Sequence, residues 1–379
     1  MSVLTVLAFL PLAIWLYLLL GRGMFWRARE RDDVQEIPEP GHWPSVTAIV
    51  PARNEADVIA RSIGTLLAQN YPGTFSLILV DDQSEDGTAK ISRELDASGR
   101  LMVISGAARP AGWTGKLWAM SQGIAHAAKE PCDYFWFTDA DIAHAPDNLR
   151  RLISRAEQQN LSLTSLMAKL SCTTPAERFL IPAFVYFFQM LYPFAWVNSA
   201  KRRMAAAAGG CMLVKRVSLE RAGGLAVIHN ALIDDCALGK LMKAQGPIWL
   251  GLTERAVSIR PYADLHAIRR MVARSAFAQL NYSALLLTGM FVGLSVMFAA
   301  PVLLALFGTG VLLIPGIEAW LVMAASFIPM LQFYGRSPTW ALTLPLIGLF
   351  YAVFTLDSAA QHWFGRGGMW KGRAQAIAR

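Results

Sequence analysis

The chain has 379 residues, of which 54% are hydrophobic and only 16% are charged. Soluble proteins carry about 25% charged residues, so this composition excludes an ordinary soluble enzyme and predicts membrane spans. The formal net charge is +8, and basic residues gather beside the apolar ends, as at Arg22, Arg27, Arg29 and Arg31. We interpret this charge as attraction to an anionic membrane surface, and we expect no nucleic-acid partner.

The N-terminal segment, residues 1–21, carries no charge and is long enough to cross a bilayer core at about 1.5 Å per residue. It predicts a transmembrane anchor. A cleaved signal peptide is the alternative, but the segment lacks a basic start. Residues 22–44 form a linker containing Pro38, Pro40 and Pro44, and the arginines at its start place it on the cytoplasmic side.

Between residues 45 and 275, short apolar runs alternate with helical patterns. The expected strands are 46–50, 75–80, 101–104 and 134–137, and the expected helices are 56–69, 88–95 and 116–128. This alternation predicts an α/β domain with a mostly parallel sheet covered by helices. Within it, residues 179–197 are uncharged; we expect an interfacial segment interrupted by Pro182 and Pro193, with a true membrane span as the alternative.

From residue 282 onward the chain is again almost uncharged. Three membrane spans are expected near 282–306, 310–332 and 339–356, within a region 282–357. Residues 358–379 form a basic tail. One N-terminal and three C-terminal spans would put this tail outside, whereas the positive-inside rule keeps it inside, so its side stays open.

The cysteines are too widely spaced for a zinc site. No Cys-x-x-Cys pair occurs, and we expect reduced cytosolic thiols at all four positions, Cys132, Cys172, Cys211 and Cys236.

An Asp-x-Asp pair follows the aromatic strand 134–137. Asp139 and Asp141 therefore stand at a strand's carboxyl end, the edge at which open α/β sheets bind ligands. Two carboxylates this close repel unless a cation lies between them. Mg²⁺ or Mn²⁺ carrying substrate phosphates fits the pair, because hard cations prefer carboxylate and phosphate oxygen. A solvated strand-end loop is the alternative.

Three further polar stretches lie at strand ends or helix starts, at 51–55, 81–88 and 234–239. In the first, Asn54 is either a helix cap or part of a ligand site. In the second, a carboxylate can accept hydrogen bonds from a ribose or base, or the turn is capped by Ser84 or Asp86. In the third, an aspartate either caps a helix or serves as a general base.

In this order, the four stretches resemble family 2 glycosyltransferases, which have a GT-A (Rossmann-like) fold. Residues 80–88 resemble the nucleotide-binding Val-Asp-Asp-x-Ser-x-Asp-x-Thr element, and 139–141 the metal-binding Asp-x-Asp. Residues 234–235 resemble the Glu-Asp element that supplies the base, and 115–116 a Gly-Lys before the third helix. Family counterparts also exist for the glycine pairs at 209–210 and 223–224.

A narrower resemblance extends over nearly the whole chain. The anchor, the C-terminal spans and residues 370–373 are similar to hopanoid-associated glycosyltransferases and, more distantly, to ceramide glucosyltransferase. One departure is clear. The family often has Gln/Arg-x-x-Arg-Trp after the base, whereas here Arg274 fills the arginine place and Ser275 replaces the tryptophan.

The resemblance implies a metal-dependent, inverting transfer of a sugar from a UDP-sugar to a lipid hydroxyl at the cytoplasmic face of a bacterial-type inner membrane. It implies Asp235 as the general base and Mg²⁺ or Mn²⁺ on Asp139 and Asp141. The residues implied to bind the nucleotide sugar are Pro51, Arg53, Glu55, Asp82, Lys116, Asp139, Asp141 and Arg274. A nucleotidyltransferase-like enzyme and a catalytically inactive membrane scaffold remain the alternatives.

Overall fold

The computed structural model describes residues 3–95, 99–365, 369–370 and 373–374. The chain folds as two compact units. The helical unit contains residues 1–29, 172–195 and 261–367, and the sheet unit contains 30–171, 196–260 and 368–379. The units thus divide the chain differently from the expected continuous domain, since 172–195 and 261–275 fall in the helical unit.

The sheet unit is built around one eight-stranded mixed sheet. Its strands, in chain order, are β1 (Val46–Ala52), β2 (Phe75–Asp81), β3 (Leu101–Ser105), β4 (Tyr134–Phe137), β5 (Ile142–His144), β6 (Leu163–Lys169), β7 (Met212–Lys215) and β8 (Ile248–Ser258). Their order is β3-β2-β1-β4-β7-β6-β8-β5. The half formed by β3, β2, β1 and β4 is parallel, as predicted, whereas β7 and β5 pair antiparallel with their neighbours.

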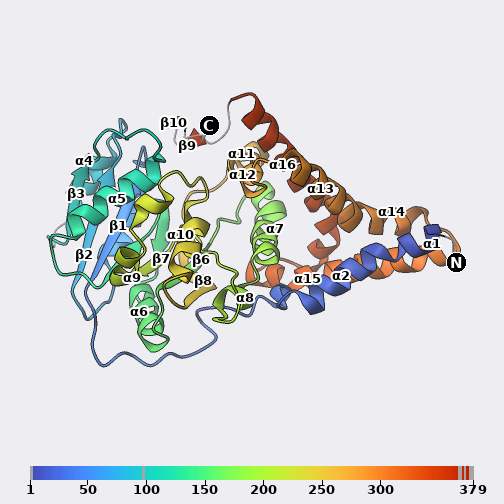
Figure 1. Cartoon of the computed structure of the whole chain (residues 1–379), viewed down its shortest axis with the longest axis horizontal. Coiled ribbons are helices and arrows are strands. Elements are labelled where there is room, and N and C mark those ends of the chain that lie inside the picture. The colour runs from blue at the N-terminus through green and yellow to red at the C-terminus, as the bar shows by residue number, and fades with distance from the viewer. Residues whose placement is uncertain (1–2, 96–98, 366–368, 371–372, 375–379) are drawn as a thin grey trace. The chain divides into compact units, whose positions relative to one another are not determined.

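Helices cover both faces of this sheet (Figure 1). Apart from α8 (Phe194–Asn198), which contains the unit boundary, the helices here are α3 (Ile59–Leu67), α4 (Thr88–Glu94), α5 (Gly115–Ala127), α6 (Asn148–Gln158), α9 (Arg216–Arg221), η2 (Leu225–Ile228) and α10 (Asp234–Lys243). Alternate β1 residues such as Ala48 and Val50 share a core with α3 and α6. Ile49 points the other way, toward Gly123 of α5.

The parallel strands bring the predicted polar loops to one edge. β1 and β2 pair in register so that Ala52 lies opposite Asp81, and Ile49 of β1 lies opposite Phe137 of β4. Because parallel strands end on the same side, the loops after β1, β2 and β4 meet at the sheet's carboxyl edge. A short two-stranded ribbon, β9 (Met369–Trp370) with β10 (Arg373–Ala374), lies in the tail. Residues 366–368, 371–372 and 375–379 of the basic tail lie outside the described residues.

The helical unit contains the apolar segments at both ends of the chain. Its elements are α1 (Val3–Ala8), α2 (Leu10–Gly21), η1 (Phe25–Arg27), α7 (Pro175–Leu191), α11 (Leu265–Ala273), α12 (Ala276–Gln279), α13 (Ala284–Leu294), the π-helical η3 (Ser295–Ala299), α14 (Ala300–Phe307), η4 (Gly310–Leu312), α15 (Leu313–Phe333), η5 (Pro338–Thr343) and α16 (Leu344–Trp363). Three continuous stretches, 284–307, 310–333 and 338–363, are long and apolar enough to cross a membrane. They lie where the three C-terminal spans were predicted.

The N-terminal apolar helix is shorter but is held within this unit. Its continuous apolar stretch runs from Val6 to Gly21, below the length of the three long helices. The Trp15 side chain is fully buried, and its indole N–H donates to the Met297 carbonyl over 2.8 Å. Arg22 donates to the Met190 carbonyl over 2.7 Å. Because the buried Trp15 N–H finds its acceptor within this unit, α2 is an integral part of it.

The predicted interfacial segment contains most of α7, a helix packed within the helical unit. A capping box begins it: Thr174 accepts from the Glu177 N–H, and Glu177 accepts from the Thr174 N–H over 2.8 Å. Tyr186 is buried, with its hydroxyl 2.6 Å from Ser326 Oγ of α15. Pro182 lies inside the continuous helix and does not interrupt it, whereas Pro193 follows its end. A position at the membrane surface stays a prediction.

We predict that Gly239→Ala destabilises the sheet unit. A Cβ at Gly239 of α10 would lie 2.7 Å from the Ala206 carbonyl carbon, so the helix must move. Overpacking of this kind costs about 1–3 kcal/mol, which would appear as a lower thermal midpoint of the detergent-solubilised protein. The matched control is Gly64→Ala in α3, where a Cβ meets nothing within 4 Å. That change should hold or raise the midpoint, and equal midpoints for both variants would contradict the prediction.

Candidate active site

Hydrogen bonds join the loops that follow β1 and β2. The backbone N–H of Asn54 donates to Ser84 Oγ over 3.0 Å, and Asn54 Oδ1 accepts from the Glu85 N–H over 2.9 Å. Asn54 has a left-handed φ of 51° and is a loop connector rather than the cap of α3. Asp86, which precedes the N-cap Gly87 of α4, accepts from the Thr88 N–H over 3.0 Å and from the Ala56 N–H over 2.9 Å. The loops therefore form one preorganised edge.

Arg53 and Asp82 lie together in this edge. Arg53 Nη1 donates to the Gln83 carbonyl over 3.1 Å and lies 4.0 Å from Asp82 Oδ2. Asp82 is only 1% exposed. The structure thus brings two of the predicted nucleotide-binding residues together, with Arg53 holding the loop that carries Asp82.

A second arginine, Arg260, lies beside carboxylates from two loops. The Arg260 guanidinium bonds to Asp57 over 2.8 and 3.0 Å and forms an ion pair with Glu55. Its Nε lies 3.8 Å from Asp141 Oδ2. Burial opposes the charge of Arg260, but Glu55 and Asp57 raise its pKa. Arg260 therefore connects Glu55 to the second carboxylate of the Asp-x-Asp pair.

Lys116 lies at the centre of a cluster of carboxylates. Its Nζ is 2.7 Å from Asp139 Oδ1 and 3.2 Å from Asp234 Oδ2. Burial works against the ammonium charge, yet Asp139 and Asp234 outweigh it and raise the pKa of Lys116. One cation from α5 thus neutralises carboxylates from the loop after β4 and from the start of α10.

Asp235 lies beside this cluster and forms no salt bridge with the residues that the structure describes. Its Oδ2 accepts from the Gly209 N–H over 3.1 Å, and its Oδ1 accepts from the Cys236 N–H over 2.7 Å. Burial, with Asp234 adding repulsion, raises the pKa of Asp235 to about 6. A Cβ at Gly209 would stand 3.1 Å from Lys116 Nζ, so glycine leaves room for the ammonium. A carboxylate with this pKa accepts a proton readily near neutral pH.

A buried hydrogen-bond chain holds the residue before Asp139. Asn148 Nδ2 donates to His144 Nδ1 over 2.9 Å, which leaves Nε2–H to donate to Thr138 Oγ1 over 2.8 Å. Thr138 in turn donates to the Gly210 carbonyl over 2.9 Å. Burial lowers the pKa of His144 to about 3, so the ring is neutral. The chain therefore ties the Asp-x-Asp loop to the segment whose Gly209 N–H binds Asp235.

The predicted residues are only partly brought together. Lys116, Asp139 and Asp235 share one cluster. Pro51 lies within β1, opposite Val80 in the ladder. Arg274 belongs to the helical unit, where it is the residue that follows α11.

Sequence reasoning missed two site residues. Asp234 was considered only as part of the Asp-Asp pair, although it is the partner of Lys116. Arg260 was not singled out, although its place two residues after β8 was an available signal. A polar residue at a strand's end in an α/β sheet is a site candidate in its own right.

Residues 47–223 match the model of Glycosyl transferase family 2 and form a family 2 glycosyltransferase domain. The succinoglycan biosynthesis protein ExoO of Rhizobium meliloti (strain 1021) is 36% identical over 115 residues, 30% of each chain. The 4,4'-diaponeurosporenoate glycosyltransferase of Staphylococcus aureus (strain bovine RF122 / ET3-1) is 31% identical over 116 residues, 30% of this chain and 29% of that protein. The chain thus spans about 30% of the length of these curated relatives.

A solved structure shares the fold over almost the whole chain. The mannosyltransferase PcManGT from Pyrobaculum calidifontis, in complex with GDP-Man and Mn²⁺, superposes with a TM-score of 0.58 at 20% identity. The match covers 96% of this chain and 100% of that one. The expected α/β, Rossmann-like glycosyltransferase fold is therefore confirmed.

We predict that His144→Leu destabilises the sheet unit most strongly at neutral pH. The change leaves the buried Asn148 amide without its acceptor, at a cost of about 1–3 kcal/mol. Because the folded pKa of His144 is lowered to about 3, the unfolded wild type gains a proton as pH falls below about 6.5, and the folded form does not. The stability difference should therefore shrink by about 1.4 kcal/mol per pH unit below that point.

Denaturant unfolding at several pH values would measure this difference. The exposed His42→Leu serves as the control and should change little. A penalty for His144→Leu that stays constant from neutral to acid pH would show that His144 is not buried as the neutral ring.

Proposed function

We propose that this chain is a metal-dependent, inverting glycosyltransferase that transfers a sugar from a UDP-sugar to a lipid hydroxyl. The observation that carries this proposal is the Lys116–Asp139–Asp234 cluster with Asp235, whose pKa is raised to about 6, at its side. Lys116 and Asp139 lie at the carboxyl edge of the sheet within residues 47–223, which match the Glycosyl transferase family 2 model, and Asp234 and Asp235 follow that match in the chain. This arrangement combines carboxylates for a divalent cation, which would carry the diphosphate, with a base for a hydroxyl.

The carboxylates fit a divalent cation shared with substrate. The side chains of Asp139 and Asp141 are 35% and 29% exposed, so both are accessible. Among the residues that the structure describes, no group of three or more His, Cys, Asp or Glu side chains could hold a metal alone. A site with one or two carboxylates suits Mg²⁺ or Mn²⁺ whose remaining ligands are water and diphosphate oxygen. Such an ion would neutralise charge on the leaving nucleoside diphosphate.

Lys116 and Arg53 supply the donor's positive environment. The ammonium of Lys116 is a mobile point charge on a flexible stem, so it can bind a diphosphate oxygen beside Asp139. Arg53 holds the loop of Asp82, where the proposed nucleoside hydrogen bonds would form. Arg274, from the helical unit, remains a proposed contact to the diphosphate.

Asp235 is proposed to take the proton of the acceptor hydroxyl. Its two backbone hydrogen bonds, from Gly209 and Cys236, fix the carboxylate while leaving it able to accept a proton. The hydroxyl oxygen then forms a bond to the anomeric carbon as the bond to the diphosphate breaks. A single displacement of this kind inverts the anomeric carbon and requires no second carboxylate as nucleophile.

A membrane lipid is the proposed acceptor. The helical unit contains three helices of membrane-spanning length, and the staphylococcal relative is named for glycosyl transfer to 4,4'-diaponeurosporenoate. The similarity to hopanoid-associated glycosyltransferases and ceramide glucosyltransferase supports the same class. The proposed location is the inner membrane with the sheet unit in the cytoplasm, where the arginines after α2 favour it.

We predict that transfer requires a divalent cation. Chelation should abolish transfer and added Mn²⁺ or Mg²⁺ should restore it, because two carboxylates cannot neutralise a diphosphate without one. Asp141→Ala should reproduce the chelated state. The measurement is transfer of labelled sugar by the purified full chain, with the exposed Glu220→Ala as a carboxylate control outside the proposed site. Full activity after dialysis against EDTA would remove the metal from the proposal.

We predict that protonation of Asp235 lowers the rate of transfer at acid pH. The base acts only when ionised, and the pKa of Asp235 is raised to about 6. The kcat/KM for the donor should therefore fall as pH drops below about 6, and stay level above it. Asp235→Asn should lower the rate by about 10²–10⁴, and the remaining rate should no longer fall below about pH 6. Wild-type rates in Asp235→Asn would rule this residue out as the base, and a matching loss of UDP binding would make its role structural.

We predict that only lipid acceptors are glycosylated. The full chain in nanodiscs, given each labelled UDP-sugar in turn, should modify extracted membrane lipid and leave water-soluble acceptors unmodified. Asp235→Asn is the negative control. A charged replacement at Phe187 is not a suitable variant here, because its ring packs on Phe298 and Tyr351 inside the helical unit. Such a change would disturb packing as well as any contact with lipid. Transfer to water-soluble acceptors alone would contradict the lipid proposal.

A further inference from the structure

A polar cavity lies on the face of the sheet that α6 covers. Its volume is about 150 Å³, and its wall includes Asp32, Asn148, Arg151, Arg155, Thr164 and Trp249. Thr164 of β6 points into it, whereas the neighbouring Ser165 points to the other face, where its Oγ accepts from the Ala208 N–H over 2.9 Å. Ala208 precedes Gly209, which binds Asp235. The cavity is therefore across the sheet from the proposed catalytic base.

Arg155 brings a buried positive charge into this wall, and the Asp32 carboxylate offsets that charge only through space. The side chain is only 5% exposed, and its guanidinium lies 3.9 Å from the centre of the Trp249 ring. Within the described part of the chain, it forms no ion pair and no hydrogen bond. Burial lowers the pKa of Arg155 to about 10, so it is still charged at neutral pH. A buried, unpaired cation is costly unless an anion reaches it.

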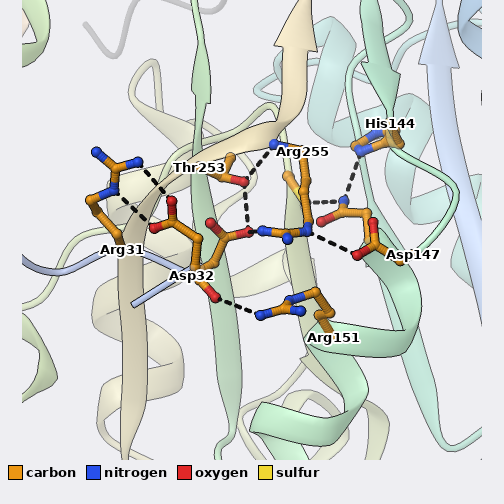
Figure 2. A network of polar contacts seen from close by, with 10 residues as sticks. Arg31, Asp32, His144, Asp147, Arg151, Thr253 and Arg255 are labelled. Carbon is orange, nitrogen blue, oxygen red and sulfur yellow. Dashed lines mark hydrogen bonds and ion pairs between the residues drawn. The ribbon is translucent and has the colours of Figure 1, made fainter. Parts of the chain in front are cut away.

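The carboxylates around the cavity already have cations. Asp32 Oδ2 accepts from Thr253 Oγ1 over 2.7 Å and lies 3.4 Å from Arg255 (Figure 2). Glu39 pairs with Arg150 over 2.6 Å. Asp147 pairs with the same Arg255. Counting Asp32, Glu39 and Asp147 against Arg150, Arg151, Arg155 and Arg255, the groups around the cavity carry one positive charge in excess.

The cavity wall also contains three oxygen atoms whose hydrogen bonds are unsatisfied. Asp32 Oδ1, Asn148 Oδ1 and Thr164 Oγ1 are buried, and none has a hydrogen-bond partner among the described residues. The first two can only accept, so an occupant must donate to them, whereas Arg155 can only donate. Water alone would satisfy the oxygens but would leave the Arg155 charge unpaired. A fitting occupant is an anion that carries its own hydrogen-bond donor.

We propose that this cavity binds a phosphate group that keeps one proton. Its P–O–H donates to Asp32 Oδ1, and its other oxygens accept from Arg155 and from the Thr164 hydroxyl. A water molecule held beside the phosphate donates to Asn148 Oδ1. The group is then held by charge-assisted hydrogen bonds from both sides. Sulfate has the same shape but no proton near neutral pH, so it would face the Asp32 carboxylate without a donor. The shared chemistry is that of inorganic phosphate and of a small phosphomonoester.

Phosphate binding to the purified full chain in detergent tests this proposal. Isothermal titration would compare inorganic phosphate, glycerol phosphate and sulfate. Both phosphates, or either one, should bind, and sulfate should bind at least about tenfold more weakly. Tighter binding of the ester would assign the cavity to a phosphorylated metabolite, and tighter binding of the free ion to inorganic phosphate.

Variants locate the binding. Arg155→Met and Thr164→Val should each weaken phosphate binding by about tenfold or more. Thr164→Val keeps the shape of the side chain, so it remains informative if Arg155→Met fails to fold. The exposed Arg61→Met controls for lost charge, and Lys116→Met controls for phosphate bound in the glycosyltransferase site; both should bind phosphate normally.

Three results would overturn the assignment. They are no phosphate binding by the folded wild type, equal binding of sulfate and phosphate, and loss of binding in Lys116→Met with normal binding in Thr164→Val. Because none of these measurements uses sugar transfer, their failure is separate from failure of the proposed function.

Discussion

The ammonium of Lys116 is the interaction on which the candidate site depends. It lies between Asp139, from the loop after β4, and Asp234, at the start of α10, with the Asp235 carboxylate close by. Without it, three buried or half-buried carboxylates would face one another, and at least one would have to take up a proton. Lys116 therefore allows the family 2 domain to concentrate negative charge at a sheet edge while Asp235 keeps a pKa at which it can act as a base.

The loops around Lys116 are held by hydrogen bonds between neutral groups. The hydrogen-bond chain from Asn148 through His144 to Thr138 fixes the Asp-x-Asp loop, and the Asn54 contacts fix the adjoining loop. Neutral partners suit this task because their strength does not change when a charged substrate arrives. The Lys116 ion pairs, in contrast, are strongly affected by added charge, which makes them the part of the site able to respond to a ligand.

The sequence predicted what depends on local pattern. The β4 strand was expected at 134–137 and is found there, because four consecutive aromatic residues fit a strand buried on both faces. The long C-terminal helices were expected because hydropathy alone determines them. The antiparallel β7 was not foreseen, since its pairing depends on residues far away in the chain. The ion pair between Lys116 and Asp234 was not predicted for the same reason. The choice of Asp235 rather than Asp234 as the base came from the family resemblance.

The charge of the cluster also constrains how a donor would bind under the proposed function. Lys116 offsets only one of the three charges on Asp139, Asp234 and Asp235, so the cluster is net negative. A diphosphate arriving alone would be repelled, whereas a divalent cation arriving alone would compete with Lys116 for Asp139. Cation and diphosphate together nearly balance, and the released ammonium can then bind a diphosphate oxygen. The site is therefore suited to a cation–nucleotide complex. Asp235, which forms no salt bridge with any described residue, then remains available to accept a proton.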